Sequence, residues 1–339
     1  MKRTSALLLT GLLLLSCLTG CGSSPASTAD GGGTVMKDEL YSMVVFSKGS
    51  EYFNWTYAGF TAAAAAMGPH IKTELVGPAE VDAAAESKAL EQLVAKKPNG
   101  IVVTSADSAT LVPSINRAVD AGIPVVGFDV DSPESRRLGF VGTDNYSFGC
   151  VAADIAATLT GGSGQAAILY VPGNVDLEKR LNGFKDTCAE KYPDLKVVSE
   201  LNHEGEVVKA ETVTLSLLQS NPEIDVVFVA EGLGATGAAS AVRSLNMSDR
   251  VKVIASDFNT STNDLMSSGE VAATIVDDPY FIGWNAFLQV WSAAHPTDRP
   301  SDNAPFGYVA GGIYCTVEGI LSENLTDSVR DKYLNPPSF

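Results

Sequence analysis

The sequence predicts an α/β protein whose parallel sheets are flanked by helices. Short, continuously apolar runs alternate with amphipathic stretches of helical period, as expected when strands are buried on both faces. The 339 residues correspond to two domains of roughly 150 residues each. A strand–helix–strand pattern in the first half is echoed in the second, which favours two similar halves.

The first half shows the alternation clearly. Over residues 83–96, Leu90 and Leu93 fall on one side of a helical stretch, and Pro98-Asn99-Gly100 ends it. The Gly-Ile-Pro turn at residues 122–124 leads into another apolar run. Strands are expected at residues 43–47, 71–76, 101–104 and 125–128, and helices at 55–67, 83–96 and 111–121.

The second half continues in the same way. Its apolar runs are short and rich in Val and Ile, which favour strands, and the stretches between them have helical length. Strands are expected at residues 166–170, 196–199, 226–230 and 251–256, and helices at 148–159, 177–191, 208–219 and 236–245.

The charge balance excludes some classes of protein. With 23 Lys and Arg against 40 Asp and Glu, the net charge of −17 argues against a nucleic-acid partner, which requires a basic face. Three His and five scattered Cys argue against most zinc and iron–sulfur sites. No metal or other cofactor is expected.

The N-terminus has the pattern of an export signal. Lys2 and Arg3 precede an apolar stretch at residues 6–15, and the uncharged run is slightly short for a membrane span. Leu18-Thr19-Gly20-Cys21 resembles the bacterial lipobox, in which cleavage precedes a lipidated Cys. We expect a signal peptide at residues 1–20, a flexible tether at 21–35 and a lipid anchor at Cys21 on the outer face of the cytoplasmic membrane. The alternative is an ordinary cleaved signal that happens to contain a Cys.

Three cysteines, Cys150, Cys188 and Cys315, lie beyond the predicted signal peptide and the lipidation site at Cys21. Export permits disulfides, so Cys150 and Cys188 could pair, but three is an odd number without framework spacing. Buried thiols, including Cys315, are the favoured interpretation.

The internal echo locates a candidate site. Asp129 and Asp257 each follow a predicted strand, and open α/β sheets bind ligands outside the carboxyl ends of their strands. If the two sheet edges face each other, both carboxylates point into one cleft. The alternative is that each Asp caps a following helix.

A glycine motif suggests a different class of protein. Residues 232–237 have the pattern G-x-G-x-x-G after a predicted strand, and Asp257 lies at the spacing of a ribose-binding acid. Its place in the second half and the expected export weigh against a dinucleotide site, and its glycines can also keep a turn small. Metalloprotease, hydrolase-elbow and phosphate-loop motifs are absent from the sequence, and His70, His203 and His295 are isolated, as surface or capping residues are. An extracellular α/β enzyme, either a glycosidase or a nucleotide-dependent oxidoreductase, remains the alternative to a binding protein.

The order of several short motifs resembles a known family. None is strong alone, but together they resemble the type I sugar-binding proteins of bacterial ABC importers, in particular the ribose-binding-protein group, from about residue 42 to 309. The motifs are the lipobox, Ser50-Glu51-Tyr52-Phe53, Gly122-Ile123-Pro124-Val125-Val126, Phe128-Asp129, Thr143-Asp144-Asn145, Arg180 with Gly183-Phe184, Ser256-Asp257 and Ala272-Ala273-Thr274-Ile275.

The resemblance implies two doubly wound, Rossmann-like lobes of the periplasmic-binding-protein type I fold, joined by a three-segment hinge. The first lobe would comprise residues 36–142 and 278–309, and the second 143–277 with the tail 310–339. It also implies a monomer that captures a small sugar or polyol between its lobes and delivers it to an ABC transporter permease, with the membrane contacted only through the lipid. A ligand sensor for a signalling partner would use the same binding physics.

The resemblance also implies a ligand site. Ser50 stands where the family often has a sugar-binding Asn, and Tyr52 and Phe53 stand at its aromatic pair, although packing at a helix start is the alternative for these two rings. Asp129 and Asp257 match the family's hydroxyl-binding aspartates, whose oxygens accept sugar O–H bonds.

The remaining matches lie in or near the second lobe. Asp277 matches a hinge residue, and Glu231 stands at the position of a second-lobe Asn. Arg180 lies in the family's Arg-x-x-Gly-Phe context, where it would either contact the ligand or hold a helix through a buried ion pair.

Departures from the family make the predicted site acidic. Val130 and Glu178 stand where the family has arginines, Gly205 replaces an aromatic residue, and Asp131 adds another acid. Such a site disfavours phosphorylated and carboxylated sugars. The expected ligand is a neutral sugar or polyol, or an amino sugar.

Overall fold

The computed structural model describes residues 37–296 and 311–335. The predicted signal peptide, tether and Cys21 lie outside the described residues, as do residues 297–309 of the predicted first lobe. In the part that is described, no helix combines the length and hydrophobicity needed to cross a membrane.

The first half is built on a six-stranded sheet in the order β11-β5-β4-β3-β1-β2. Every neighbouring pair in this sheet is parallel. β3 and β4 are buried along their whole length, which explains their uninterrupted apolar sequence. The strands are β1 (Glu39–Val44), β2 (Ile71–Val76), β3 (Gly100–Val103), β4 (Val125–Phe128), β5 (Gly139–Thr143) and β11 (Gly311–Cys315).

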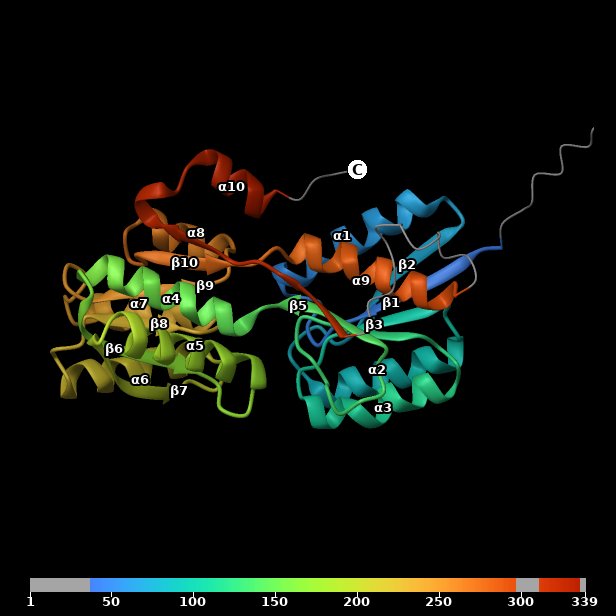
Figure 1. The fold of residues 1–339 in the computed structure, drawn as a ribbon, viewed down its shortest axis with the longest axis horizontal. Helices are drawn as coiled ribbons and strands as arrows, with labels where there is room; N and C mark the ends of the chain where they lie inside the picture. The colour runs from blue at the N-terminus through green and yellow to red at the C-terminus, as the bar shows by residue number, and fades with distance from the viewer. Residues whose placement is uncertain (1–36, 297–310, 336–339) are drawn as a thin grey trace, which may run out of the picture. The chain divides into compact units, whose positions relative to one another are not determined.

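Helices cover both faces of this sheet. Figure 1 shows α1 (Glu51–Met67) and α9 (Pro279–Ala294) on one face, and α2 (Ala83–Lys96) and α3 (Ser108–Asp120) on the other. Phe60 and Phe287 belong to the core under the first pair, and Leu90 and Leu111 to the core under the second.

The second half repeats this plan. Its sheet has the order β12-β10-β9-β8-β6-β7, and only the edge pair β10 and β12 is antiparallel among the described strands. The strands are β6 (Ser163–Tyr170), β7 (Asp194–Asn202), β8 (Val226–Val229), β9 (Lys252–Ser256), β10 (Ala273–Val276) and β12 (Glu318–Leu321). The helices are α4 (Asn145–Thr160) and α5 (Val175–Lys191) on one core, and α6 (Val207–Ser220), α7 (Gly234–Ser244), α8 (Thr260–Ser267) and α10 (Asp327–Leu334) on the other, with a 3₁₀ turn at Ser322–Asn324.

The α/β prediction is thus confirmed. The chain passes between the halves after β5, after β10 and between β11 and β12. The sequence assigned all of residues 310–339 to the second lobe, whereas β11 pairs in register with β5 of the first sheet. The two initial glycines of this strand leave an apolar run of only three residues, which is too short to predict a strand.

Cys150, Cys188 and Cys315 are free thiols, as the favoured interpretation expected. Burial raises the pKa of Cys188 to about 11 and that of Cys315 to about 12, so neither thiol is a ready nucleophile.

Reciprocal glycines let neighbouring helices touch. A Cβ on Gly59 of α1 would lie 2.0 Å from the Tyr280 carbonyl oxygen of α9, and one on Gly283 of α9 would lie 1.8 Å from the Thr56 oxygen of α1. Gly149 and Gly183 make the same kind of contact between α4 and α5. One helix pair in each half, α1 with α9 and α4 with α5, therefore packs backbone to backbone.

We expect Gly59→Ala to destabilise the protein by about 1–3 kcal/mol, because the added methyl group meets backbone that cannot rotate away. Helix propensity alone would favour Ala by about 1 kcal/mol, so the sign of the effect distinguishes the two causes. Urea unfolding gives the measurement. Ala66→Gly, at an exposed position of the same helix, serves as the control, with an expected loss of about 0.5–1 kcal/mol. A Gly59→Ala protein as stable as the wild type would contradict the close packing.

Candidate ligand-binding cleft

Asp129 and Asp257 occupy equivalent positions in the two halves. Asp129 directly follows β4, Asp257 directly follows β9, and their φ angles are +59° and +66°. Each backbone N–H donates to the next strand, to the Val141 oxygen at 3.0 Å and to the Ile275 oxygen at 2.8 Å. Left-handed backbone at a non-glycine residue is uncommon and is often found at functional sites.

Neither Asp caps a helix. The residue that caps α8 is Asn259, whose side chain accepts from the Thr262 N–H. The helix-cap alternative for the two aspartates is therefore not observed, and Asp129 Oδ2 instead accepts the Thr104 hydroxyl at 3.3 Å.

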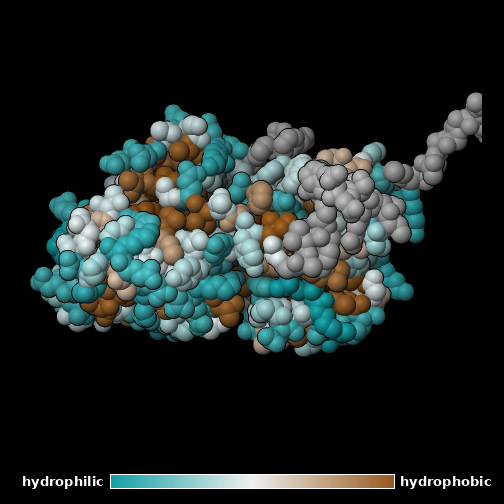
Figure 2. Space-filling view, viewed as in Figure 1, coloured by the Kyte–Doolittle hydropathy of each residue, from teal (hydrophilic) through white to brown (hydrophobic). Residues whose placement is uncertain are grey.

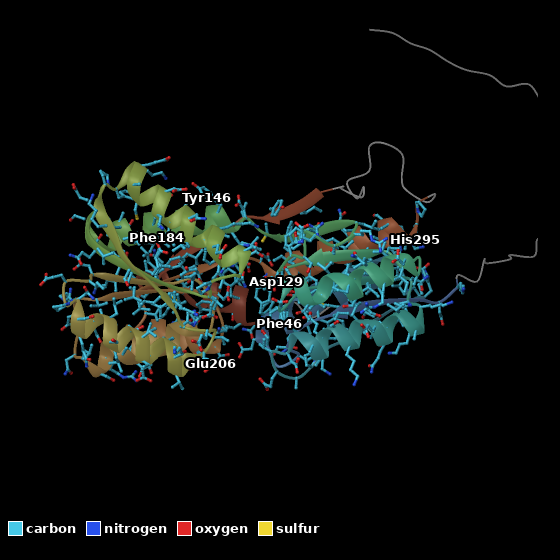
Figure 3. The ribbon with its side chains drawn as sticks, turned by 90° about the horizontal axis from the view of Figure 1, so that it is seen from below. Phe46, Asp129, Tyr146, Phe184, Glu206 and His295 are labelled. Carbon is cyan, nitrogen blue, oxygen red and sulfur yellow. The ribbon has the colours of Figure 1, made fainter. Side chains whose placement is uncertain are left out.

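A cavity of about 1400 Å³ lies at these strand ends. Its walls come from both halves of the chain, and Ser105, Val130 and Gly205 also line it. Figure 3 shows Asp129 beside Phe46, another lining residue, at the end of the first sheet opposite His295. Eight of the ten predicted ligand residues line this cavity: Ser50, Tyr52, Phe53, Asp129, Arg180, Glu231, Asp257 and Asp277.

Asp131 and Glu178 are not among the lining residues. Asp131 forms a two-pronged ion pair with Arg137, which satisfies both of its oxygens. Glu178 accepts the Gly173 N–H at 2.9 Å and so stabilises the start of α5. The expectation that these two acids face the ligand therefore disagrees with their positions in the structure, because each is taken up by a local partner.

Burial and mutual repulsion raise the pKa values of the cleft acids. Burial, followed by the charges of Asp277 and Asp257, raises the pKa of Asp129 to about 8. Burial raises the pKa of Asp257 to about 7, although the Arg180 charge opposes the shift. Burial also raises the pKa of Asp277. Near neutral pH the carboxyls of Asp129 and Asp257 are therefore close to their protonation midpoints rather than fully ionised.

Asp277 joins the segments that cross between the halves. Its Oδ2 accepts the Tyr52 hydroxyl of α1 at 3.4 Å and also accepts the Thr143 hydroxyl at the end of β5. Asp277 itself follows β10, so this one carboxylate connects two crossings to the first helix. A ligand that contacts Asp277 would therefore contact the hinge directly.

The two predicted aromatic residues differ in their exposure. Phe53 is only 2% exposed and packs edge-on against Phe46, with ring centroids 4.8 Å apart, so most of its surface belongs to the core. Tyr52 is half-buried and directs its hydroxyl to Asp277. The packing alternative thus describes Phe53 better than Tyr52.

Neutral groups hold Arg180 in place. Its Nε donates to Asn145 Oδ1 at 2.7 Å, its Nη1 donates to the Ala230 carbonyl at 2.9 Å, and its guanidinium lies 3.7 Å from the centre of the Phe148 ring. None of these partners is an acid, so the buried ion pair considered from the sequence is not observed. The charge of Arg180 instead stabilises the ionised form of Asp257, which partly opposes the rise in the pKa of that residue caused by burial.

The glycine motif has a packing explanation. A Cβ on Gly232 would lie 2.5 Å from Asp257 Oδ2, and one on Gly237 would lie 2.2 Å from the Val207 oxygen of α6. Glu231 accepts the N–H groups of Leu233 at 2.8 Å and Gly234 at 2.6 Å, so a carboxylate already occupies the helix start where a dinucleotide would place its pyrophosphate. These residues do not fit a dinucleotide.

Several residues of the site were missed from the sequence. Glu51 accepts the backbone N–H and the hydroxyl of Thr260 at 3.2 and 3.3 Å, which links α1 of one half to α8 of the other. His203, expected at the surface, is fully buried and lies 3.3 Å from Glu231, and burial lowers its pKa. Glu51 lies within the segment Ser50-Glu51-Tyr52-Phe53, but no sequence pattern predicts its contact or that of His203, because both contacts join segments that are distant in sequence.

Comparison with known proteins identifies the family. Residues 41–295 match the periplasmic binding protein domain. The chain belongs to the periplasmic binding protein family. Among its relatives, the D-ribose/D-allose-binding protein of Pseudomonas aeruginosa is 30% identical over 202 residues, which span 58% of this chain and 63% of that protein.

Other relatives match over more of their length. The ribose import binding protein of Bacillus subtilis is 26% identical over 285 residues, covering 84% of this periplasmic binding protein and 90% of the relative. The solved structure of the arabinose-binding protein AraP from Geobacillus stearothermophilus is 31% identical, with a TM-score of 0.77, covering 85% of this chain and 98% of that one. The type I fold inferred from the sequence is therefore shared with these structures.

The raised pKa of Asp129 predicts a pH-dependent stability for this periplasmic binding protein. An unfolded Asp has a pKa of about 3.9, so between pH 4 and 8 the folded chain retains a proton that the unfolded chain releases, and stability falls as the pH rises. Asp129→Asn removes this titration. The stability of Asp129→Asn relative to the wild type, both without ligand, should therefore rise by about 3–4 kcal/mol between pH 5 and pH 8, as measured by chemical unfolding at each pH.

Asp107→Asn is the matched control. Bonds from the hydroxyl and N–H of Thr110 lower the pKa of Asp107, so its titration lies below this pH window and its effect on stability stays constant between pH 5 and 8. A constant stability difference for Asp129→Asn over the same range would contradict the raised pKa.

Proposed function

We propose that this chain is an extracytoplasmic solute-binding protein that captures a small sugar, polyol or amino sugar and delivers it to an ABC transporter permease. The observation that carries the proposal is the convergence of Asp129 and Asp257, one from each half, on one cavity together with Arg180. The sugar-binding names of its relatives support the same class of ligand.

The chemistry of the walls suits a polyhydroxylated ligand. Carboxylate oxygens accept O–H bonds, and the half-buried ring of Tyr52 offers an apolar face to ring C–H groups. Among the described lining residues, nine are acidic and only Arg180 and Lys332 are basic. Desolvating a phosphate or carboxylate in such surroundings is costly, whereas a neutral sugar or an amine is accepted.

Capture would proceed by closure of the two halves. A ligand held by one half offers hydroxyl groups to the other, so it binds the closed form better and increases its population. The Glu51–Thr260 bonds already connect the halves. Because such exposed bonds contribute little stability, they would not prevent the two halves from separating.

The same proposal includes the location and partners. The family works outside the cytoplasm, and the lipobox-like segment supports lipidation of Cys21 at the outer face of the cytoplasmic membrane. We propose a monomer with an N-terminal lobe, a C-terminal lobe and a lipid tether. The permease would recognise the closed, ligand-bound form.

Titration calorimetry with a sugar panel tests the proposal. We expect saturable binding of at least one neutral or amino sugar, and no binding of the matching sugar phosphate or sugar acid. Asp257→Asn should lower the affinity about 10- to 150-fold, because a hydrogen bond to a charged group contributes about 1.5–3 kcal/mol. Glu178→Gln, an acid outside the cavity, should leave the affinity unchanged. Tighter binding of the acidic sugars would contradict the proposal.

Catalysis can be tested with the same ligand. We expect the bound sugar to be recovered unchanged after prolonged incubation, as judged by mass spectrometry, because binding proteins release what they capture. Conversion of the sugar would instead support the extracellular enzyme considered from the sequence.

A further inference from the structure

The C-terminal helix α10 is attached to the second half. Val329 and Tyr333 pack on the core that contains Met266, and the Tyr333 ring lies 5.8 Å from the Phe258 ring. Arg330 donates to Asn263 of α8 at 3.1 Å. Figure 2 shows hydrophobic surface (brown) directly below the hydrophilic outer side of this helix. α10 is therefore a fixed part of the second half, although it lies beyond the region that matches the family domain.

The same helix lines the ligand cavity. Asp331, Lys332 and Tyr333 are lining residues, and so is Asn335, which donates to Asp331 Oδ1 at 3.0 Å. The Nζ atom of Lys332 forms an ion pair with Glu318 Oε2 at 2.8 Å, so its charge is already paired and does not attract an anionic ligand.

The opposite wall of this end of the cavity comes from α1. Glu51 bonds to Thr260 at the start of α8, the helix to which α10 is attached, and Trp55 follows one turn later on α1. Trp55 is half-buried and lines the cavity, as does Phe258. An aromatic ring and the polar groups of α10 thus border the cavity at the α8 end, in addition to the aspartates at the strand ends.

We propose that α10 and Trp55 form an outer subsite for a second ring, so that the preferred ligand is a disaccharide or another glycoside. This inference rests on the proposed function and specifies its ligand. The cavity of about 1400 Å³ exceeds the roughly 300–1,000 Å³ of pockets that hold drug-sized ligands. Indole faces stack on sugar rings, and the Asp331 carboxylate and Asn335 amide supply hydrogen bonds to hydroxyl groups.

Calorimetry with paired ligands tests the outer subsite. The probes are glucose, galactose and xylose against cellobiose, maltose, lactose and xylobiose. We expect at least one disaccharide to bind 10-fold or more tightly than its component monosaccharide. Trp55→Ala should reduce that preference to less than threefold, and Asp331→Asn should weaken disaccharide binding severalfold without changing monosaccharide binding.

Asp327→Asn is the matched control on the same helix, because Asp327 bonds to Arg330 but does not line the cavity. Its disaccharide affinity should equal that of the wild type, and circular dichroism checks that all variants are folded. Monosaccharides that bind as tightly as the disaccharides, or equal effects of Asp331→Asn and Asp327→Asn, would overturn the outer subsite but leave sugar binding intact. No binding of any of these sugars or of the wider panel would overturn the proposed function and this inference together.

Discussion

The arrangement of the cleft depends on one constraint, the backbone conformation that follows two parallel strands. At Asp129 and Asp257 the chain turns into the left-handed region and keeps its N–H bonded to the neighbouring strand. The side chain then leaves the sheet at its carboxyl end instead of capping the next helix. Because both halves use the same turn, the two carboxylates line one cavity.

This arrangement places several acidic groups at buried positions close enough to repel one another. Burial and repulsion raise the pKa of Asp129 to about 8, and Arg180 partly compensates at Asp257. The compensation is incomplete because neutral groups, Asn145 and the Ala230 carbonyl, already hold the guanidinium. The ligand-free cleft is therefore destabilised by its own acids, and a ligand that donates hydrogen bonds to them relieves this cost.

The sequence predicted the buried parts of the fold best. β3, β4 and β8 have no polar side chain, and β9 is apolar between Lys252 and Ser256, so these strands could be predicted from composition alone. β11 was missed because its first two residues are glycines, and α10 because it has no long apolar stripe.

The site was predictable only in part. Strand ends could be located, which brought Asp129 and Asp257 into the prediction, whereas the direction of a side chain depends on partners that are distant in sequence. Asp131 turns to Arg137 instead of the cavity, and the contact of Glu51 with Thr260 spans 209 residues. Neither the residue types nor their spacing in the sequence predicts which partner each of these side chains contacts.

Asp277 shows how binding and closure would be coupled in the function that we propose. It accepts hydroxyl groups from Tyr52 and Thr143, so its carboxylate is shared by the first helix and by two of the crossing segments. A ligand hydroxyl bonded to the same carboxylate competes with or joins these donors, and either outcome changes the energy of the hinge. The scarcity of basic residues along the described cleft walls fits the uncharged ligand that we propose.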